Sequence, residues 1–196
     1  MTRRRKVLAA MLSCALAGSA ALAASAPQSD AAQTRPAGKA TARAHATLAG
    51  EGVSGTVEFV EMAYDTGNEV EITLTAKGLK PGLHGVHLHA VGKCEPPAFT
   101  AAGGHFDPGP AGNVDPDANH PFHMGDIPNL RVGADGSGTL QARTTRVTLS
   151  AGPVSLFDAD GSAVIVHGNP DQGTTGEPKS GVSGGPRVAC GAIEKK

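Results

Sequence analysis

The sequence of 196 residues lacks several patterns, and each absence narrows the class of protein. It has no stretch with the apolar spacing of an amphipathic helix of ordinary length, which argues against a helical fold. Apart from residues 7–23 it has no apolar run that approaches a membrane span, and that run is short and rich in alanine. Basic residues are not in excess, since 17 Lys and Arg face 18 Asp and Glu. We therefore expect neither a membrane span nor a nucleic-acid partner.

The N-terminus has the order of features that is typical of a secretory signal peptide. Three arginines and a lysine at residues 3–6 precede an apolar stretch that ends in small residues. We place the signal peptide at residues 1–23, because cleavage after the next Ala-x-Ala would leave Pro27 first. The arginine run resembles a twin-arginine export signal, and Met11–Cys14 loosely resembles a lipoprotein box. We expect a periplasmic or secreted protein, and lipid anchoring is the less favoured alternative.

Removing residues 1–23 takes away four basic residues and no acidic residue, so the formal net charge changes from −1 to −5. This mildly acidic balance gives no reason to expect an anionic polymer as partner, although a local positive patch can still attract a small anion. Two cysteines remain, Cys94 and Cys190. Two thiols in an oxidising compartment most simply pair, so we expect a disulfide between them.

Residues 24–45 are rich in Ala, Pro and polar residues without periodicity, so we expect a flexible linker there and one domain at residues 46–196. In the domain, apolar and polar residues alternate as they do in half-buried strands. The expected strands lie at residues 56–60, 70–76, 86–90, 138–144, 146–149, 163–167 and 187–193. Short strands between Gly-rich turns predict an all-β fold, an antiparallel sandwich or barrel.

Two long segments do not have the pattern of strands. Residues 92–131 are rich in Pro, Gly, Asp and His, and residues 167–187 are rich in Gly, Pro and Ser. Structureless loops of this length are usually either functional or disordered. Because these two carry most of the polar chemistry, we expect functional loops.

Seven of the eight histidines lie between residues 84 and 167, in or beside these loops. His87 and His89 are two residues apart in an expected strand, so their side chains point to one face. His167 ends a second expected strand. Several imidazoles together suit copper(II) or zinc, and Asp126, three residues after His123, adds a carboxylate that suits zinc.

Four short motifs resemble the successive signatures of copper/zinc superoxide dismutases. They are GVHLH at residues 85–89, GGHFDP at 103–108, HMGD at 123–126 and GPRVACG at 185–191. The resemblance covers residues 46–196, and it is specific because the motifs occur in the family's order with similar spacing. It implies a Greek-key β-sandwich or flattened barrel with two long functional loops.

The resemblance also implies a role for each matching residue. One copper per subunit would be bound by four histidines, namely His87, His89, His105 and His167. One zinc per subunit would be bound by His105, His123 and Asp126, with His105 bridging the two metals as an imidazolate. Arg187 would stand beside the copper, and Asp171 would orient histidines of both metals. Cys94 and Cys190 would form the family's disulfide.

One departure from the family's pattern concerns zinc. Family members place a further zinc histidine about eight residues after the bridging one, and this sequence has Asn113 there. The same segment contains one other histidine, His120, and we predict that it is the third zinc histidine. The alternative is an exposed His120 with zinc weakly held or absent. His84 falls on the opposite strand face from His87, so we interpret it as a structural histidine.

The implied activity is the disproportionation of superoxide anion to dioxygen and hydrogen peroxide by a redox-cycling copper that a structural zinc supports. Arg187 and His105 would be its catalytic residues, and the enzyme would protect against superoxide outside the cytoplasm. A metal carrier on the same fold would have little need for Arg187. A metal-free adhesive or structural domain would not need four such histidines. The sequence leaves the oligomeric state open, a homodimer included.

Overall fold

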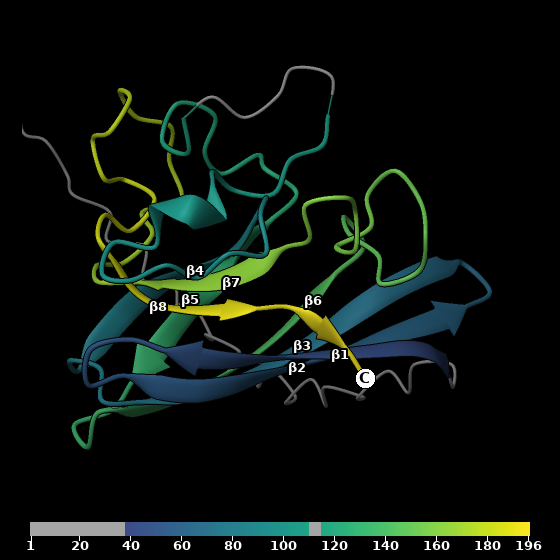
Figure 1. Ribbon diagram of the computed structural model, residues 1–196, viewed down its shortest axis with the longest axis horizontal. Coiled ribbons are helices and arrows are strands. Elements are labelled where there is room, and N and C mark those ends of the chain that lie inside the picture. Colours follow the sequence, from purple (N-terminus) through teal and green to yellow (C-terminus); the bar gives the residue numbers. More distant parts are fainter. Residues whose placement is uncertain (1–37, 110–114) are drawn as a thin grey trace, which may run out of the picture. The chain divides into compact units, whose positions relative to one another are not determined.

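The structure is a computed structural model that describes residues 38–109 and 115–196. In these ranges nine strands pair antiparallel, which confirms the prediction of an all-β fold, and no helix there is long and apolar enough to cross a membrane. The elements are β1 (Lys39–Ala49), β2 (Ser54–Tyr64), β3 (Gly67–Lys77), β4 (Gly82–His89), the 3-10 helix η1 (Thr100–Ala102), β5 (Asp126–Val132), β6 (Ser137–Thr144), β7 (Ala163–His167), β8 (Arg187–Ala192) and β9 (Glu194–Lys195) (Figure 1).

The strands close into a barrel. β1 pairs with β2 along one side and with β8 and β9 along the other, so the sheet returns to its first strand. The order around the barrel is β1, β2, β3, β6, β5, β4, β7, β8 and again β1. β3 lies beside β6, and β4 lies beside β7, so neither pair follows the order of the sequence. This is the Greek-key arrangement that the family resemblance implies.

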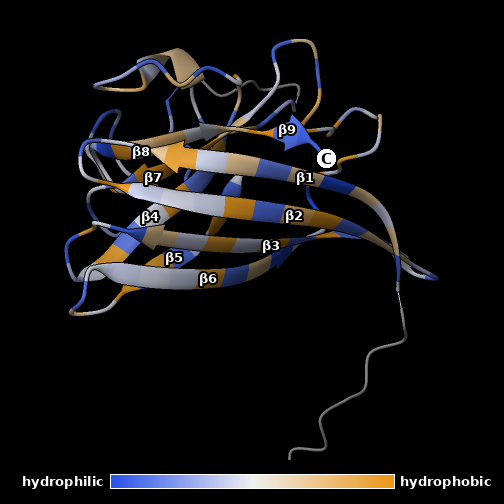
Figure 2. Cartoon of the chain, turned by 60° about the horizontal axis from the view of Figure 1, so that its bottom comes forward, coloured by the Kyte–Doolittle hydropathy of each residue, from blue (hydrophilic) through white to orange (hydrophobic). Residues whose placement is uncertain are grey.

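Alternation of apolar and polar residues places the core inside the barrel. In β3 the side chains of Val70, Ile72, Leu74 and Ala76 are buried and alternate with more exposed polar residues. Figure 2 shows hydrophobic and hydrophilic residues alternating along the neighbouring strands as well. β7 differs, because all five of its residues are buried. A second apolar cluster explains this difference: Phe99 and Ala102 from the segment around η1 pack with Ala163, Ile165 and Cys190. The outer side of β7 is therefore covered by a loop.

The long connections gather beside β4, β7 and β8. Figure 1 shows the segment after β4 in teal and the segment of residues 168–186 in yellow over this part of the barrel. Backbone bonds tie the first of them to β4, since Phe106 N donates to Leu88 O (2.7 Å) and Leu88 N donates to Gly125 O (2.9 Å). Polar loop residues are thus held against the outer face of β4.

A third long connection, residues 145–162, is held by a buried carboxylate on β2. Glu61 accepts hydrogen bonds from the amides of Leu149 and Ser150 (both 2.7 Å), from the Ser150 hydroxyl and from Asn68 Nδ2 (2.6 Å). Burial alone would raise the pKa of Glu61, but these donors outweigh it and lower the pKa below its ordinary value. The charge of Glu61 therefore stabilises the loop.

The structure corrects the expected elements at three places. β1 begins at Lys39, before the expected domain start at Ala46, because its inward residues are mainly alanines that give a weak apolar signal. β5 lies within the segment that we expected to be loop, and its Pro128 falls where the pairing with β4 is shifted by a bulge, a position that tolerates proline. Residues 146–149 form only an isolated bridge, from Thr148 to Ser155. The expected signal peptide (1–23) and the linker up to residue 37 lie outside the described residues.

Candidate metal centre

Four buried histidines from three parts of the chain meet on the outer side of β4 and β7. They are His87 and His89 on β4, His105 in the segment after η1 and His167 at the end of β7. β4 pairs with β7, and His89 faces His105 across an isolated bridge. One ring nitrogen from each of the four lies within 4.8 Å of the others. The four predicted copper ligands are thus brought together.

Hydrogen bonds fix which nitrogen of three rings faces the centre of this cluster. His89 Nδ1 donates to Gly103 O, and His167 Nδ1 donates to Gly185 O, both at 3.0 Å. His87 Nε2 donates to Asp171 Oδ2 at 2.9 Å. The other nitrogen of each ring is buried and has no hydrogen-bond partner among the described residues. Because its partner nitrogen carries the proton, this nitrogen has a lone pair, which is what a soft or borderline metal ion needs.

The second cluster is arranged around the carboxylate of Asp126 at the start of β5. His105 Nδ1 lies 2.6 Å from Oδ1, and His120 Nδ1 and His123 Nδ1 lie 3.4 and 3.2 Å from Oδ2. All four side chains are buried. The group whose ligand atoms all lie within 4.8 Å of one another is His87, His105, His120 and Asp126, so His87 takes the place of His123 in it, and His123 joins the cluster through its contact with Asp126. The four predicted zinc ligands are together, and His120 is turned inward with 0% exposure rather than exposed.

Asp171 connects the two clusters. Its Oδ2 accepts from His87 Nε2 (2.9 Å), and its Oδ1 accepts from His120 Nε2 (2.6 Å). The side-chain amide of Asn129 on β5 makes two hydrogen bonds to the backbone of Asp171. Asn129 Nδ2 donates to Asp171 O (2.8 Å), and Asp171 N donates to Asn129 Oδ1 (2.9 Å). One carboxylate therefore orients a histidine of each cluster, as the resemblance implies.

Burial keeps the four clustered histidines neutral. It lowers the pKa of His89 and of His167 well below the ordinary value, and the positive charge of Arg187 acts in the same direction. Burial also lowers the pKa of His105 to about 4, although Asp126 opposes the shift. The pKa of His87 is lowered by burial against the opposing bond to Asp171. Neutral imidazole is the form that binds a metal ion.

At His120 the neighbouring carboxylates raise the pKa, whereas burial lowers the pKa of the four clustered histidines. Burial lowers its pKa, but Asp126 and Asp171 outweigh burial and raise the pKa to about 9. Burial raises the pKa values of these two carboxyl groups, and their hydrogen bonds to the histidines lower both far below the ordinary range. Both carboxylates are therefore ionised. A metal ion that takes His120 as a ligand must displace its proton.

Comparisons with known proteins agree with this arrangement. A family model described as copper/zinc superoxide dismutase matches residues 53–193. The chain belongs to the copper/zinc superoxide dismutase family. A Cu-Zn superoxide dismutase of Caulobacter vibrioides is 42% identical over 130 residues, which cover 64% of this chain and 71% of that protein. One of Aquifex aeolicus is 38% identical over 159 residues, covering 77% and 86%. The resemblance and the prediction of an enzyme of this family are confirmed.

Solved structures share the fold of this superoxide dismutase family member. A SOD-like protein from Bacillus subtilis is 34% identical with a TM-score of 0.62, and the match covers 76% of this chain and 96% of that one. The clock protein EA4 is 26% identical with a TM-score of 0.63, covering 82% and 98%. The predicted fold class is thus confirmed in sequence and in structure.

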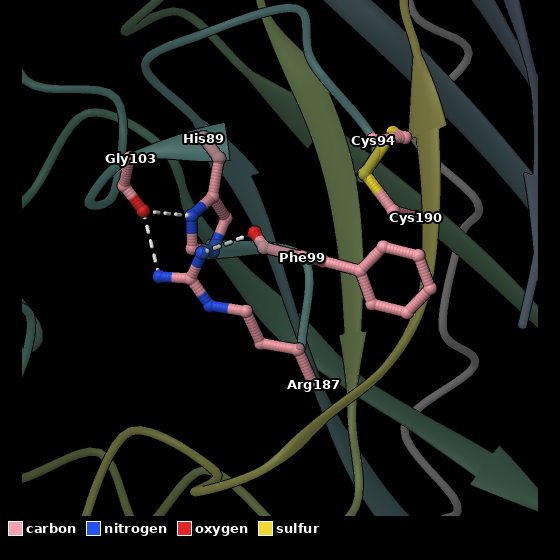
Figure 3. Close-up of a disulfide and its surroundings, with 6 residues drawn as sticks. All are labelled: His89, Cys94, Phe99, Gly103, Arg187 and Cys190. Atoms are coloured by element: carbon pink, nitrogen blue, oxygen red, sulfur yellow. Dashed lines mark hydrogen bonds between the residues drawn. A yellow bond between two sulfur atoms is a disulfide. The ribbon is translucent and has the colours of Figure 1, made fainter. Parts of the chain in front are cut away.

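The predicted family disulfide is present, and it lies next to Arg187. Cys94 and Cys190 are bonded, with their Cα atoms 5.5 Å apart. Arg187 Nη1 donates to Phe99 O (2.7 Å) and Nη2 donates to Gly103 O (2.6 Å), the same carbonyl that accepts from His89 (Figure 3). Burial lowers the pKa of Arg187. Because the ordinary pKa of a guanidinium is so high, the group nevertheless stays charged. A fixed cation therefore stands beside the cluster of His87, His89, His105 and His167.

His84 does not belong to either cluster. Its Nδ1 lies 2.7 Å from His167 O, and its Nε2 lies 2.8 Å from Lys80 O, so both nitrogens face carbonyl acceptors. The structural role expected for His84 agrees with these contacts.

Sequence reasoning missed Arg146, which lies just after β6. It donates through Nη1 to His123 O (2.9 Å) and through Nη2 to Asp126 O, so it fixes the backbone of two predicted zinc ligands. No motif marks this residue, because its partners are main-chain carbonyls. Asn129 was missed for the same reason, since it holds Asp171 through main-chain groups.

Proposed function

We propose that the chain disproportionates superoxide anion outside the cytoplasm, with copper held by His87, His89, His105 and His167, and zinc held by His105, His120, His123 and Asp126. The donor atoms fit these metals. The copper side offers imidazole nitrogens alone, whereas the zinc side adds a carboxylate. The observation that carries the proposal is the orientation of the copper-side rings, in which one nitrogen is bonded outward and the other faces the cluster.

Copper, when bound, supplies the one-electron redox change that allows one superoxide to be oxidised and a second to be reduced. The overall reaction consumes two superoxide anions and two protons and yields dioxygen and hydrogen peroxide. The protein's residues must therefore attract an anion, hold it beside the cluster and deliver protons. They must also keep His87, His89 and His167 oriented through the cycle, which the bonds to Asp171, Gly103 and Gly185 favour.

Arg187 is suited to hold the anion. Its two bonds to the carbonyls of Phe99 and Gly103 fix the guanidinium plane, and it shares Gly103 O with His89. A fixed cation in a low-dielectric site gives a small anion a defined place, and such steering, described for this family of enzymes, raises association rates by about 10- to 1,000-fold. A protein that only carried copper would not need this cation.

His105 is suited to handle a proton. It belongs to both clusters, and Asp126 binds its Nδ1 at 2.6 Å on the zinc side. Nδ1 would lose its proton on binding zinc, and Nε2 would then be the ring nitrogen that holds a proton and donates it to the peroxide product. The carboxylate orients the ring and raises its basicity, while burial of the ring lowers it.

We place the protein in the periplasm or outside the cell, after removal of residues 1–23. The disulfide favours an oxidising compartment.

Superoxide decay after pulse radiolysis or in stopped flow tests the function. The protein loaded with copper and zinc should accelerate the decay, and removal of copper should abolish the effect. Metal analysis of the same sample should give one copper and one zinc per chain. A fully copper-loaded protein that leaves the decay rate unchanged would refute the enzyme and favour the metal carrier.

A further inference from the structure

The segment that leads into His120 contains a buried carboxylate that the proposed mechanism does not use. Asp117 is 3% exposed, and its Oδ2 accepts from Gly181 N at 2.7 Å. Its Oδ1 accepts from both the amide and the hydroxyl of Ser183, at 3.0 and 2.6 Å. Burial raises the pKa of Asp117, and these donors outweigh burial and lower it. A buried charge with three donors from another loop is a strong cross-link between segments far apart in the sequence.

The far end of this cross-link lies directly against a predicted copper ligand. Gly185, two residues after Ser183, provides the carbonyl that accepts from His167 Nδ1 at 3.0 Å. Gly184 has a φ of 106°, and a Cβ added there would lie 2.7 Å from His167 Cβ. The backbone at residues 184 and 185 therefore touches His167, and its position sets the orientation of the imidazole ring.

The other end of the cross-link, Asp117 itself, lies in residues 115–126, which we call the zinc-side segment because they contain His120, His123 and Asp126. Asp117 is three residues before His120, and its own carbonyl accepts from Gly176 N at 3.0 Å. Thr175 Oγ1 donates to His120 O at 2.6 Å. The loop of residues 168–186 is thus bonded to the zinc-side segment at several points, and among the carboxylates that take part, Asp117 is the one that binds the backbone next to Gly184 and Gly185.

We propose that Asp117 is a positioning residue that ties the zinc-side segment to residues 181–185 and thereby sets the orientation of His167. Asp171 connects the two clusters through the rings of His87 and His120, and Asp117 connects them by a separate route through the backbone. The inference rests on the proposed function in one respect, the role of His167 as a copper ligand. The tie itself can be measured in the metal-free protein.

The test compares Asp117→Ala and Asp117→Asn with Asp135→Asn as a matched control. Asp135 also accepts from the amide and hydroxyl of one serine, Ser137 (3.1 and 2.6 Å), but in the exposed turn between β5 and β6. In Asp117→Asn the amide can still accept from Ser183, while its NH2 group opposes Gly181 N–H. The effect of Asp117→Asn should therefore lie between those of the wild type and Asp117→Ala.

The first readout is amide hydrogen exchange in the metal-free protein. Loss of a charged hydrogen bond should accelerate exchange at Gly181 and Ser183 by roughly 10- to 100-fold in Asp117→Ala. The second is the copper(II) electron paramagnetic resonance spectrum with copper affinity. Removing partners that orient a ligand weakens metal binding roughly 10- to 100-fold, so Asp117→Ala should change the spectrum and lower affinity by that factor, whereas Asp135→Asn should change neither.

Two results would overturn the inference. One is unchanged exchange at Gly181 and Ser183 in Asp117→Ala, which would mean that there is no tie. The other is faster exchange with an unchanged copper spectrum and affinity, which would mean that the tie does not orient His167. If Asp117→Ala does not fold, Ser183→Ala removes one donor and should give a smaller change of the same kind. Wild-type protein that binds copper without accelerating superoxide decay would refute the proposed function and leave the tie intact.

Discussion

Replacing His120 with alanine measures its contribution to zinc binding. The change removes an imidazole whose Nδ1 lies 3.4 Å from Asp126 Oδ2, and it leaves Asp171 Oδ1 with Gly173 N but without His120 Nε2, each at 2.6 Å in the wild type. Structural zinc sites with four ligands have apparent binding free energies of about 10–16 kcal/mol, so an equal share for one ligand is about 2.5–4 kcal/mol. At about 1.4 kcal/mol per factor of ten, zinc affinity should fall roughly 50- to 1,000-fold.

The assay is a competition titration of zinc against a chromogenic chelator, together with metal analysis. His45→Ala is the control for loss of a histidine, because His45 lies on β1 and outside both clusters. Asp171→Asn keeps His120 but removes the carboxylate that orients it, and should weaken zinc binding about 10- to 100-fold. If His120→Ala binds zinc as tightly and in the same amount as the wild type, the assignment of His120 is wrong.

Three further predictions concern the cation, the buried carboxylate and the disulfide. Arg187→Ala should lower kcat/KM for superoxide about tenfold or more and flatten its dependence on ionic strength in stopped flow, and an unchanged rate would contradict the role of Arg187. Glu61→Gln should lower the free energy of unfolding at pH 7 by about 1.5–3 kcal/mol in urea titrations. Because the pKa of Glu61 is lowered on folding, its stabilisation is complete above the unfolded value of about 4.3 and is lost as the pH falls through the folded pKa, so the two proteins should converge in acid. Replacing Cys94 and Cys190 with serine should cost about 4–5 kcal/mol in the same titration, and equal stability would contradict this.

Strands with strongly alternating residues could be predicted from the sequence, and β3 is the clearest example. β1 was not among the expected strands, because alanine contributes little to a hydrophobic pattern even where it is buried, as at Ala44 and Ala46. β5 was missed because its bulge contains Pro128, which reads as a strand breaker in sequence. Both strands are recognised in the structure by the neighbours that they pair with.

Some residues of the candidate site could also be predicted from the sequence, and others could not. The spacing of His87 and His89 indicates a shared strand face, and the resemblance adds the distant His105 and His167. Arg146 and Asp117 could not be found, because each acts mainly on backbone groups of another segment. Main-chain donors and acceptors are present at almost every residue, so only the folded structure shows which of them a side chain reaches.

The closure of the barrel by β1 also determines when folding can be completed. Ala49 pairs with Cys190 and Ala44 pairs with Lys195, so β1, the first of the described strands, finds these partners only in β8 and β9, the last of the described strands. Contacts of such high sequence separation must overcome loop-closure entropy before they form, and all-β proteins dominated by them fold in about milliseconds to seconds. A folding chain therefore keeps one edge of β1 unpaired until β8 and β9 are available. Cys94 likewise has no native thiol to react with until Cys190 in β8 is available, so barrel closure and cross-linking both depend on β8.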